Sequence, residues 1–226
     1  MINVQLKHAS FSNNLINDEC GLWLQTVAED SNRNRPDRYW VVTVPDGTQL
    51  FTYGTKSAHD SSAMPSNING IPVEPQFRSG MMTYHGPGQI GILCVVNYSR
   101  LYRYGDQINL QNIIDTFCSS VNDEFNETLV SDHEDPGLYR STGEKIMGFG
   151  IDTTGIRWMA IKIYLNLHVD LNVYTDATIC GVTNRPMGNL LPSLPDLTTQ
   201  AQMGENIVRR FWDYLYKDYQ VSDWSV

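Results

Sequence analysis

Residues 90–98 read IGILCVVNY, a continuous apolar run that is rich in β-branched side chains. A run of this length and composition is typical of a central β-strand that is buried on both faces of a sheet. Cys94 lies inside the run, where a free thiol usually behaves as a small hydrophobic side chain. The stretch therefore predicts the middle of a covered sheet, with Cys94 as a structural residue.

Three other segments carry apolar residues at helical spacing. They are residues 14–28, residues 110–129 and the C-terminal stretch 203–215. Each places its apolar side chains on one face, which predicts an amphipathic helix. Cys118 falls on the apolar face of the second helix and is interpreted as structural.

Further strands are expected on both sides of the central one. Residues 39–44 and 48–54 are separated by Pro-Asp-Gly, which predicts a β-hairpin or two tightly joined strands. Residues 136–151 and the alternating stretch 158–171 predict an antiparallel region, whereas Ser, Asn and Pro in residues 55–77 predict a long loop. We expect an α+β fold with a mixed sheet covered by helices, in which residues 1–226 form a single domain.

Charge and composition exclude several function classes. The formal net charge is −9, with 16 Lys and Arg against 25 Asp and Glu, so a nucleic-acid binder is not expected. The N-terminus lacks an apolar signal region, no window is apolar enough to span a membrane, and the four Cys are too few for a disulfide scaffold. We expect a cytoplasmic protein. An anionic partner would need a local basic rim, for which Arg33, Arg35, Arg38 and Lys56 are candidates.

Residues 78–90 form a glycine-rich stretch, RSGMMTYHGPGQI, that contains no acidic residue. A phosphate loop needs Gly-Lys-Ser/Thr at its end, and a dinucleotide loop needs G-x-G-x-x-G at the start of a helix. Neither pattern is present. His85 has no second ligand at metal-binding spacing, so the stretch does not predict a metal site either.

Cys180 differs from the structural thiols because it follows an alternating strand and directly precedes Gly181. That position suits a nucleophile at the mouth of a pocket, although a buried structural Cys is the commoner interpretation of the pattern alone. A nearby cation would activate the thiol, and Lys145 is a candidate if its strand lies beside Cys180.

The stretch 78–89 resembles the signature R-G-G-x-x-T-Y-H-G-P-G-Q of the octanoyltransferase family and differs from it at Ser79. LFTYG at 50–54, residues 136–151, and residues 164–171 with 179–182 are similar to further family segments and occur in family order. The resemblance covers most of the chain. It implies the fold shared with lipoate and biotin protein ligases.

The resemblance also implies an activity and a site. The implied reaction transfers an octanoyl group from acyl carrier protein to a lysine of lipoyl domains, as the first step of endogenous protein lipoylation. Cys180 matches the acyl-thioester nucleophile, and Lys145 matches the lysine that lowers the pKa of that thiol and moves protons. The implied substrate-binding residues are Arg78, Ser79, Gly80, Met81, Met82, Thr83, Tyr84, His85, Gly148, Phe149 and Gly150.

The implied partners are octanoyl-acyl carrier protein, the lipoyl domains of 2-oxoacid dehydrogenases and the glycine cleavage H protein. We expect a monomer, which suits an acyltransferase with large partners, and neither a cofactor nor a metal. Net charge and hydropathy leave neither nucleic acid nor a membrane as an expected partner. Ile161 and Lys162 stand where the family has His-Gly, which leaves the preferred acyl length open. Two alternatives remain at this point: an ATP-dependent lipoate–protein ligase, and a non-catalytic relative that binds lipoyl domains.

Overall fold

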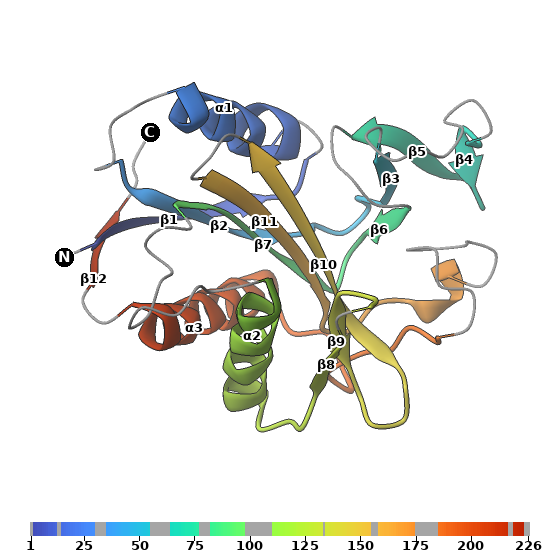
Figure 1. The fold of residues 1–226 in the computed structure, drawn as a ribbon. Coiled ribbons are helices and arrows are strands. Elements are labelled where there is room, and N and C mark those ends of the chain that lie inside the picture. The colour runs from blue at the N-terminus through green and yellow to red at the C-terminus, as the bar shows by residue number, and fades with distance from the viewer. Residues whose placement is uncertain are drawn as a thin grey trace.

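The fold is a large sheet with helices on both faces and a smaller sheet beside it (Figure 1). The computed structural model describes residues 2–12, 15–29, 35–54, 64–76, 82–97, 110–132, 134–154, 158–174, 185–216 and 219–223. In Figure 1, α1 (Gly21–Glu29) lies above the large sheet, and α2 (Leu110–Phe125) and α3 (Leu197–Leu215) lie below it. This arrangement confirms the expected α+β fold with a mixed sheet covered by helices.

The large sheet has eight strands, and its order along the sheet differs from the order along the chain. The strands are, in spatial order, β12 (Tyr219–Asp223), β1 (Ile2–Ser10), β2 (Asp37–Thr43), β7 (Gln89–Asn97), β11 (Trp158–Asn166), β10 (Lys145–Thr154), β9 (Gly137–Tyr139) and β8 (Val130–Asp132). The strand β1 pairs in parallel with β12 and β2, and every later pair in this order is antiparallel. The strands β1 and β12 were not predicted from the sequence.

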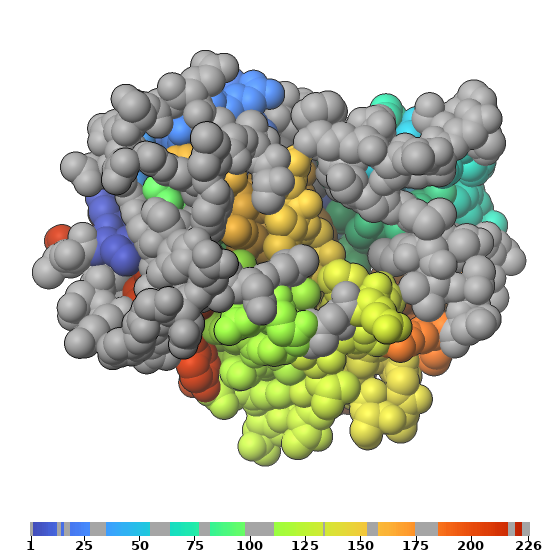
Figure 2. Space-filling view, in the orientation of Figure 1, coloured from blue at the N-terminus to red at the C-terminus, as the bar shows by residue number. Residues whose placement is uncertain are grey.

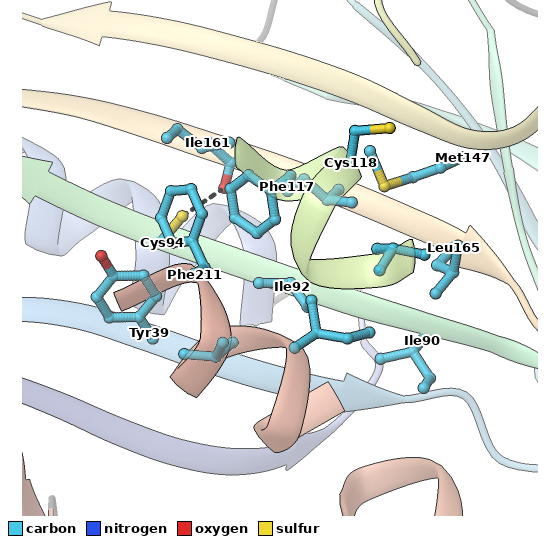
Figure 3. Packing of buried hydrophobic residues seen from close by; sticks show 14 of the residues in the cluster. Tyr39, Ile90, Ile92, Cys94, Phe117, Cys118, Met147, Ile161, Leu165 and Phe211 are labelled. Atoms are coloured by element: carbon cyan, nitrogen blue, oxygen red, sulfur yellow. Dashed lines mark hydrogen bonds between the residues drawn. The ribbon is translucent and has the colours of Figure 1, made fainter. Parts of the chain in front are cut away.

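The central strand β7 confirms the interpretation of the apolar run. All nine of its residues are buried, and it pairs with β2 on one side and β11 on the other. Figure 3 shows the core on the side of α2 and α3, where the Cys94 thiol donates a 3.7 Å hydrogen bond to the carbonyl of Ile161. Phe117 and Phe211 stack at 3.8 Å between ring centroids and join the two helices in this core.

The second sheet corrects two expectations. It has the order β4 (Asn67–Ile68), β5 (Ile71–Gln76), β3 (Leu50–Gly54) and β6 (Thr83–His85). The strands β2 and β3 lie in different sheets, so the hairpin interpretation was wrong. The 55–77 stretch is also not a continuous loop. Asn69 and Gly70 both have positive φ and join β4 to β5, as expected for an Asn-Gly hairpin turn.

The three predicted helices are present with small changes at their ends. The first begins as a π-helix over Leu15–Cys20 before α1, and α2 ends at Phe125, short of the predicted 129. A short 3-10 helix spans Leu171–Tyr174. The helix α3 starts earlier than its apolar stripe because Asp196 caps it, accepting a hydrogen bond from the amide of Thr199. Among the described helices, none is long and apolar enough to cross a membrane.

Candidate active site

Lys145 stands at the first position of β10, where another segment of the chain pairs with it. Its amide donates to the carbonyl of Pro186 at 2.8 Å, and its carbonyl accepts from the amide of Gly188 at 2.9 Å. Lys145 and Met187 form an isolated parallel bridge. Residues 186–188 are the described segment that follows Cys180 in the sequence, so the fold brings that segment against Lys145.

Cys180 itself lies outside the described residues, as do Arg78, Ser79, Gly80 and Met81. The described chain resumes at Arg185. The predicted contact between Cys180 and Lys145 therefore stays a prediction. The other three thiols are described, and each is buried: Cys20, Cys94 and Cys118.

Burial makes those three thiols poor nucleophiles. Burial raises the pKa of Cys20 and of Cys118 to about 11 and that of Cys94 well above its ordinary value. Because the thiolate is the reactive form, none of the three is ionised appreciably at neutral pH. Cys94 and Cys118 thus occupy the structural positions expected from the sequence.

The side chain of Lys145 is enclosed, with 4% of its surface exposed. Its Nζ donates a 2.6 Å hydrogen bond to Oδ1 of Asp135 and lies 5.4 Å from the centroid of the Tyr139 ring. Gly137 makes room for this side chain, because a Cβ on Gly137 would lie 2.9 Å from Cε of Lys145 and 2.4 Å from the carbonyl oxygen of Met147. The result is a buried ammonium beside a carboxylate and an aromatic ring.

The motif residues Met82, Thr83, Tyr84 and His85 lie in or next to β6 of the smaller sheet. Met82 and Tyr84 are buried in its apolar core, and Thr83 is half-buried. Nε2 of His85 shares a 2.9 Å hydrogen bond with Oγ1 of Thr52. The His85 imidazole is thus held by the smaller sheet.

Two aromatic rings of the larger sheet region enclose the His85 imidazole. Phe11 stacks on it at 4.8 Å, and Tyr164 meets it edge-on at 4.2 Å between ring centroids. Tyr164 belongs to β11, so His85 links the two sheets.

The turn after His85 connects this motif to the Lys145 region. The carboxamide of Gln89 accepts from the amide of Gly86 at 3.1 Å and donates to Oδ1 of Asn166 at 2.8 Å. Asn166 in turn donates to the carbonyl of Gly188 at 3.2 Å. Gly88 has φ +88°, and a Cβ there would lie 2.0 Å from the carbonyl oxygen of His168, so only glycine fits.

Gly148 and Gly150 lie on the same face of β10 and leave that face without side chains at these two positions. Gly148 lies opposite Tyr164 and Gly150 opposite Lys162 in the register with β11. A Cβ on Gly148 would meet no described atom within 4 Å. Figure 2 shows the gold surface of β10 and β11 between the blue surface of α1 and the green surface of α2.

Phe149 points to the other face of β10, because successive side chains of a strand alternate. Its ring packs edge-on against Phe117 of α2 at 5.9 Å between centroids, within the main core. The structure therefore separates the three implied β10 residues: the two glycines face the α1 side, and Phe149 faces the helical core.

Three residues that contact the Lys145 region were missed in the sequence: Asp135, Tyr139 and Arg185. The Tyr139 hydroxyl donates to both the backbone carbonyl of Asp135, at 2.9 Å, and its carboxylate. Arg185 places its guanidinium 4.6 Å from the centroid of the Tyr139 ring. Neither their charge nor their spacing in the sequence indicated a role in the site. Asp135 and Tyr139 nevertheless flank Pro-Gly-Leu in or next to the family-like segment 136–151.

Two of the four residues of the expected basic rim are described, and they lie together away from Lys145. Arg35 and Arg38 sit over the Trp23 ring of α1, at 6.0 and 3.4 Å from its centroid. Arg38 is near the start of β2, which pairs with the far end of β7, whereas Lys145 is near the opposite end of the sheet. Arg33 and Lys56 lie outside the described residues.

Sequence comparison finds related octanoyltransferases. The chain is 28% identical over 173 residues to an octanoyltransferase of Vesicomyosocius okutanii, covering 74% of this chain and 78% of the relative. It is 24% identical over 196 residues to that of Actinobacillus pleuropneumoniae, covering 85% and 86%. No family model matches the chain. These relatives confirm the octanoyltransferase resemblance noted in the motifs.

Structure comparison finds the same fold in lipoate–protein ligases. A bi-partite lipoate protein ligase from Thermoplasma acidophilum superposes with a TM-score of 0.66 at 14% identity, covering all of this chain and 88% of that one. Lipoate-protein ligase A bound with ATP gives a TM-score of 0.65 at 14% identity, covering all of this chain and 90% of that one. At this level of identity the likeness establishes a shared fold.

Proposed function

Because this chain is a relative of the octanoyltransferases, and therefore an acyltransferase, we propose that it moves an octanoyl group from acyl carrier protein to a lysine of a lipoyl domain. The acyl group is held in between as a thioester on Cys180. The observation that carries this proposal is the buried Lys145 ammonium, whose backbone pairs with the segment that follows Cys180.

Chain connectivity supports a Cys180/Lys145 dyad. Cys180 precedes Arg185 by five residues (185 − 180 = 5), and five residues of extended chain span at most about 18 Å. The next residue, Pro186, is hydrogen-bonded to Lys145. The intervening chain is therefore long enough to place the thiol beside Nζ, where an ammonium stabilises a thiolate.

The proposed reaction has two transfers. In the first, the Cys180 sulfur attacks the octanoyl thioester, the bond to the carrier sulfur breaks, and the thiol proton ends on the carrier thiol. In the second, the acceptor lysine amine attacks the Cys180 thioester, an amide forms, and the amine proton returns to the Cys180 sulfur. Lys145 is the proton carrier in both, and backbone N–H donors of a Gly-rich segment stabilise each oxyanion. The thioester retains the acyl bond energy, so no ATP is consumed.

We further propose that the open face of β10 accommodates the acyl chain. Gly148 and Gly150 leave space there, and the aromatic pair of His85 and Tyr164 provides an apolar wall beside Gly148. Arg78, Ser79, Gly80 and Met81 complete the proposed acyl site. In this proposal, residues 1–226 form one catalytic domain. It acts in the cytoplasm as a monomer on lipoyl domains such as those of 2-oxoacid dehydrogenases and H protein.

Intact-mass measurement tests the proposal. The protein is incubated with octanoyl-acyl carrier protein, and we expect a mass increase of one octanoyl group that hydroxylamine removes and that peptide mapping assigns to Cys180. Cys180→Ser is the test variant, and Cys94→Ser is the matched control because Cys94 is buried in the core. An unmodified wild-type protein, under conditions in which a relative is acylated, would refute the mechanism.

Because the chain shares its fold with lipoate–protein ligases, a second candidate function is that of an ATP-dependent ligase that acts on a free acid. That reaction needs no cysteine nucleophile. Cys180→Ala separates the two functions: a ligase retains transfer from free octanoate and ATP, whereas the proposed acyltransferase loses transfer from the carrier protein.

A further inference from the structure

Asp135 is the charged partner of Lys145. The distance of 2.6 Å between Nζ and Oδ1 is that of a short, charge-assisted hydrogen bond. Both side chains are largely enclosed, with exposed fractions of 4% for Lys145 and 17% for Asp135. An isolated ammonium at such a place would be costly to bury, so the carboxylate is what makes a charged Lys145 compatible with this position.

Tyr139 holds the second oxygen of the same carboxylate. Its hydroxyl donates to Oδ2 of Asp135, and its ring also borders Nζ of Lys145. Burial, followed by the hydrogen bond to Asp135 and the negative charge of that residue, raises the pKa of Tyr139. The phenol therefore stays a hydrogen-bond donor at neutral pH. The Asp135 carboxylate is thus held from both oxygens, and its orientation is set by the hairpin around it.

Asp132 organises the turn that carries Asp135. One of its oxygens accepts from the amides of Glu134, at 2.9 Å, and Asp135, at 3.2 Å. The other accepts from Nη1 of Arg185 at 2.6 Å. The backbone hydrogen bond from Asp135, followed by the hydrogen bond from Arg185, lowers the pKa of Asp132, so this carboxylate stays ionised in mildly acid solution. The turn is thereby tied to the segment that follows Cys180.

We propose that Asp135 is a positioning residue for Lys145, which fixes Nζ in one place. A lysine side chain has a flexible four-carbon stem, so a single fixed acceptor removes much of its freedom. An ammonium has three N–H donors, and Asp135 accepts one, so the same nitrogen can also donate to a thiolate. This inference rests on the proposed function, because it assigns Asp135 a role in the reaction of the Cys180/Lys145 dyad.

Asp135→Asn tests the inference through its separate effects on kcat and KM. We expect kcat for octanoyl transfer to fall roughly 10- to 100-fold, because the proton carrier is no longer held in place, with KM for octanoyl-acyl carrier protein nearly unchanged. Asp135→Glu restores the negative charge and is expected to recover part of the lost kcat.

Asp123 provides the matched control, since its carboxylate accepts a 2.7 Å hydrogen bond from the Tyr214 hydroxyl at the surface, on other elements. Asp123→Asn is expected to leave kcat and KM unchanged. If Asp135→Asn does not fold, Tyr139→Phe carries the test, because it removes the hydroxyl that donates to the carbonyl and the carboxylate of Asp135. We expect it to lower kcat by less than Asp135→Asn would, with KM nearly unchanged.

The outcomes separate this inference from the proposed function. A wild-type protein that forms no octanoyl adduct refutes the proposed function itself. A wild-type protein that transfers octanoyl, together with a folded Asp135→Asn protein of wild-type kcat, overturns the positioning role alone. In the absence of a folded Asp135→Asn protein, a wild-type kcat for Tyr139→Phe overturns it.

Discussion

The carboxamide of Gln89 donates a 2.8 Å hydrogen bond to Oδ1 of Asn166, a residue 77 positions further along the chain. Both side chains are buried. Through Asn166 the bond reaches the carbonyl of Gly188, whose amide is bonded to Lys145. This relationship connects the glycine-rich motif to the proposed catalytic lysine, although the two lie far apart in the sequence.

Gln89→Ala is expected to destabilise the fold. The change leaves the amide of Gly86 and Oδ1 of Asn166 without their buried partner, and each loss costs about 1–3 kcal/mol. We expect the free energy of unfolding in urea to fall by about 2–6 kcal/mol. Gln202→Ala is the control, because Gln202 makes an exposed hydrogen bond on α3 and its loss should change stability by less than about 0.5 kcal/mol. Equal losses for both variants would contradict the prediction.

Gly137→Ala is expected to displace Lys145. The new Cβ would lie 2.9 Å from Cε of Lys145 and 2.4 Å from the carbonyl oxygen of Met147, so the strand or the side chain must move. We expect a lower unfolding free energy and at least roughly 10-fold slower transfer by the protein that remains folded, because the proton carrier is misplaced.

The control is Gly143→Ala in the same hairpin. Gly143 has φ +94°, and a Cβ at this position would meet no described atom within 4 Å, so alanine introduces backbone strain of about 1 kcal/mol without touching Lys145. This variant is expected to be less stable and yet to transfer at the wild-type rate when folded. A Gly137→Ala protein with wild-type transfer would argue against the need for a fixed Lys145.

Lys162→Gly is expected to change the acyl-length preference. Lys162 is half-buried on β11, directly opposite Gly150 on the proposed acyl face, so its removal lengthens the space available. Each added methylene that becomes buried contributes about 0.8 kcal/mol, so the rate with decanoyl relative to octanoyl carrier protein is expected to rise by roughly 4-fold if one methylene is buried and roughly 15-fold if both are.

Lys162→Met separates the effect of the space available to the acyl chain from the effect of the lysine charge, because methionine keeps much of the bulk of lysine without the ammonium. We expect Lys162→Met to retain the wild-type ratio. The ratio of transfer rates with the two carrier substrates is the measurement, and an unchanged ratio in Lys162→Gly would show that the acyl chain does not reach this residue.

The Cys20 thiol is expected to make stability fall at alkaline pH. Burial raises its pKa from about 9 to about 11, so the unfolded chain loses this proton at a lower pH than the folded protein. The contribution of the protonated thiol to the free energy of unfolding is fully present below pH 9 and is lost as the pH rises toward 11. The loss is at most about 2.7 kcal/mol for a pKa difference of two units.

Urea unfolding at several pH values checks this prediction. The tyrosines Tyr39 and Tyr216, whose pKa values burial also raises, give a slope of the same sign in both proteins. Cys20→Ala is therefore compared with the wild type, and we expect a shallower fall for the variant between pH 9 and 11. Parallel curves would show that Cys20 ionises normally in the folded state.

The spacing of apolar residues in the sequence predicted those helices and strands that are specified by residues close together along the chain. The apolar, β-branched run of β7 is typical of a strand buried on both faces, and the spacing of apolar residues on α2 and α3 indicates a helix with one buried side. The motif of residues 78–89 was sufficient to recognise the family, and an Asn-Gly turn at 69–70 was present but overlooked.

Pairing between distant strands could not be predicted in the same way. The short connection between β2 and β3 suggested a hairpin, but the two strands enter different sheets. The edge strand β12 joins β1 from the other end of the chain. Such pairings depend on which backbone edges and apolar faces meet, and a local pattern does not contain that information.

By itself, the sequence determined the strand and helix patterns, the family resemblance and the residue types of the proposed dyad. Only the tertiary structure decided that Lys145 is buried, that Asp135 and Tyr139 enclose its ammonium, and that Gln89 reaches Asn166. The physical reason is that residue chemistry and local periodicity belong to short stretches of chain. The charge partner and burial of a side chain instead depend on segments that only folding brings together.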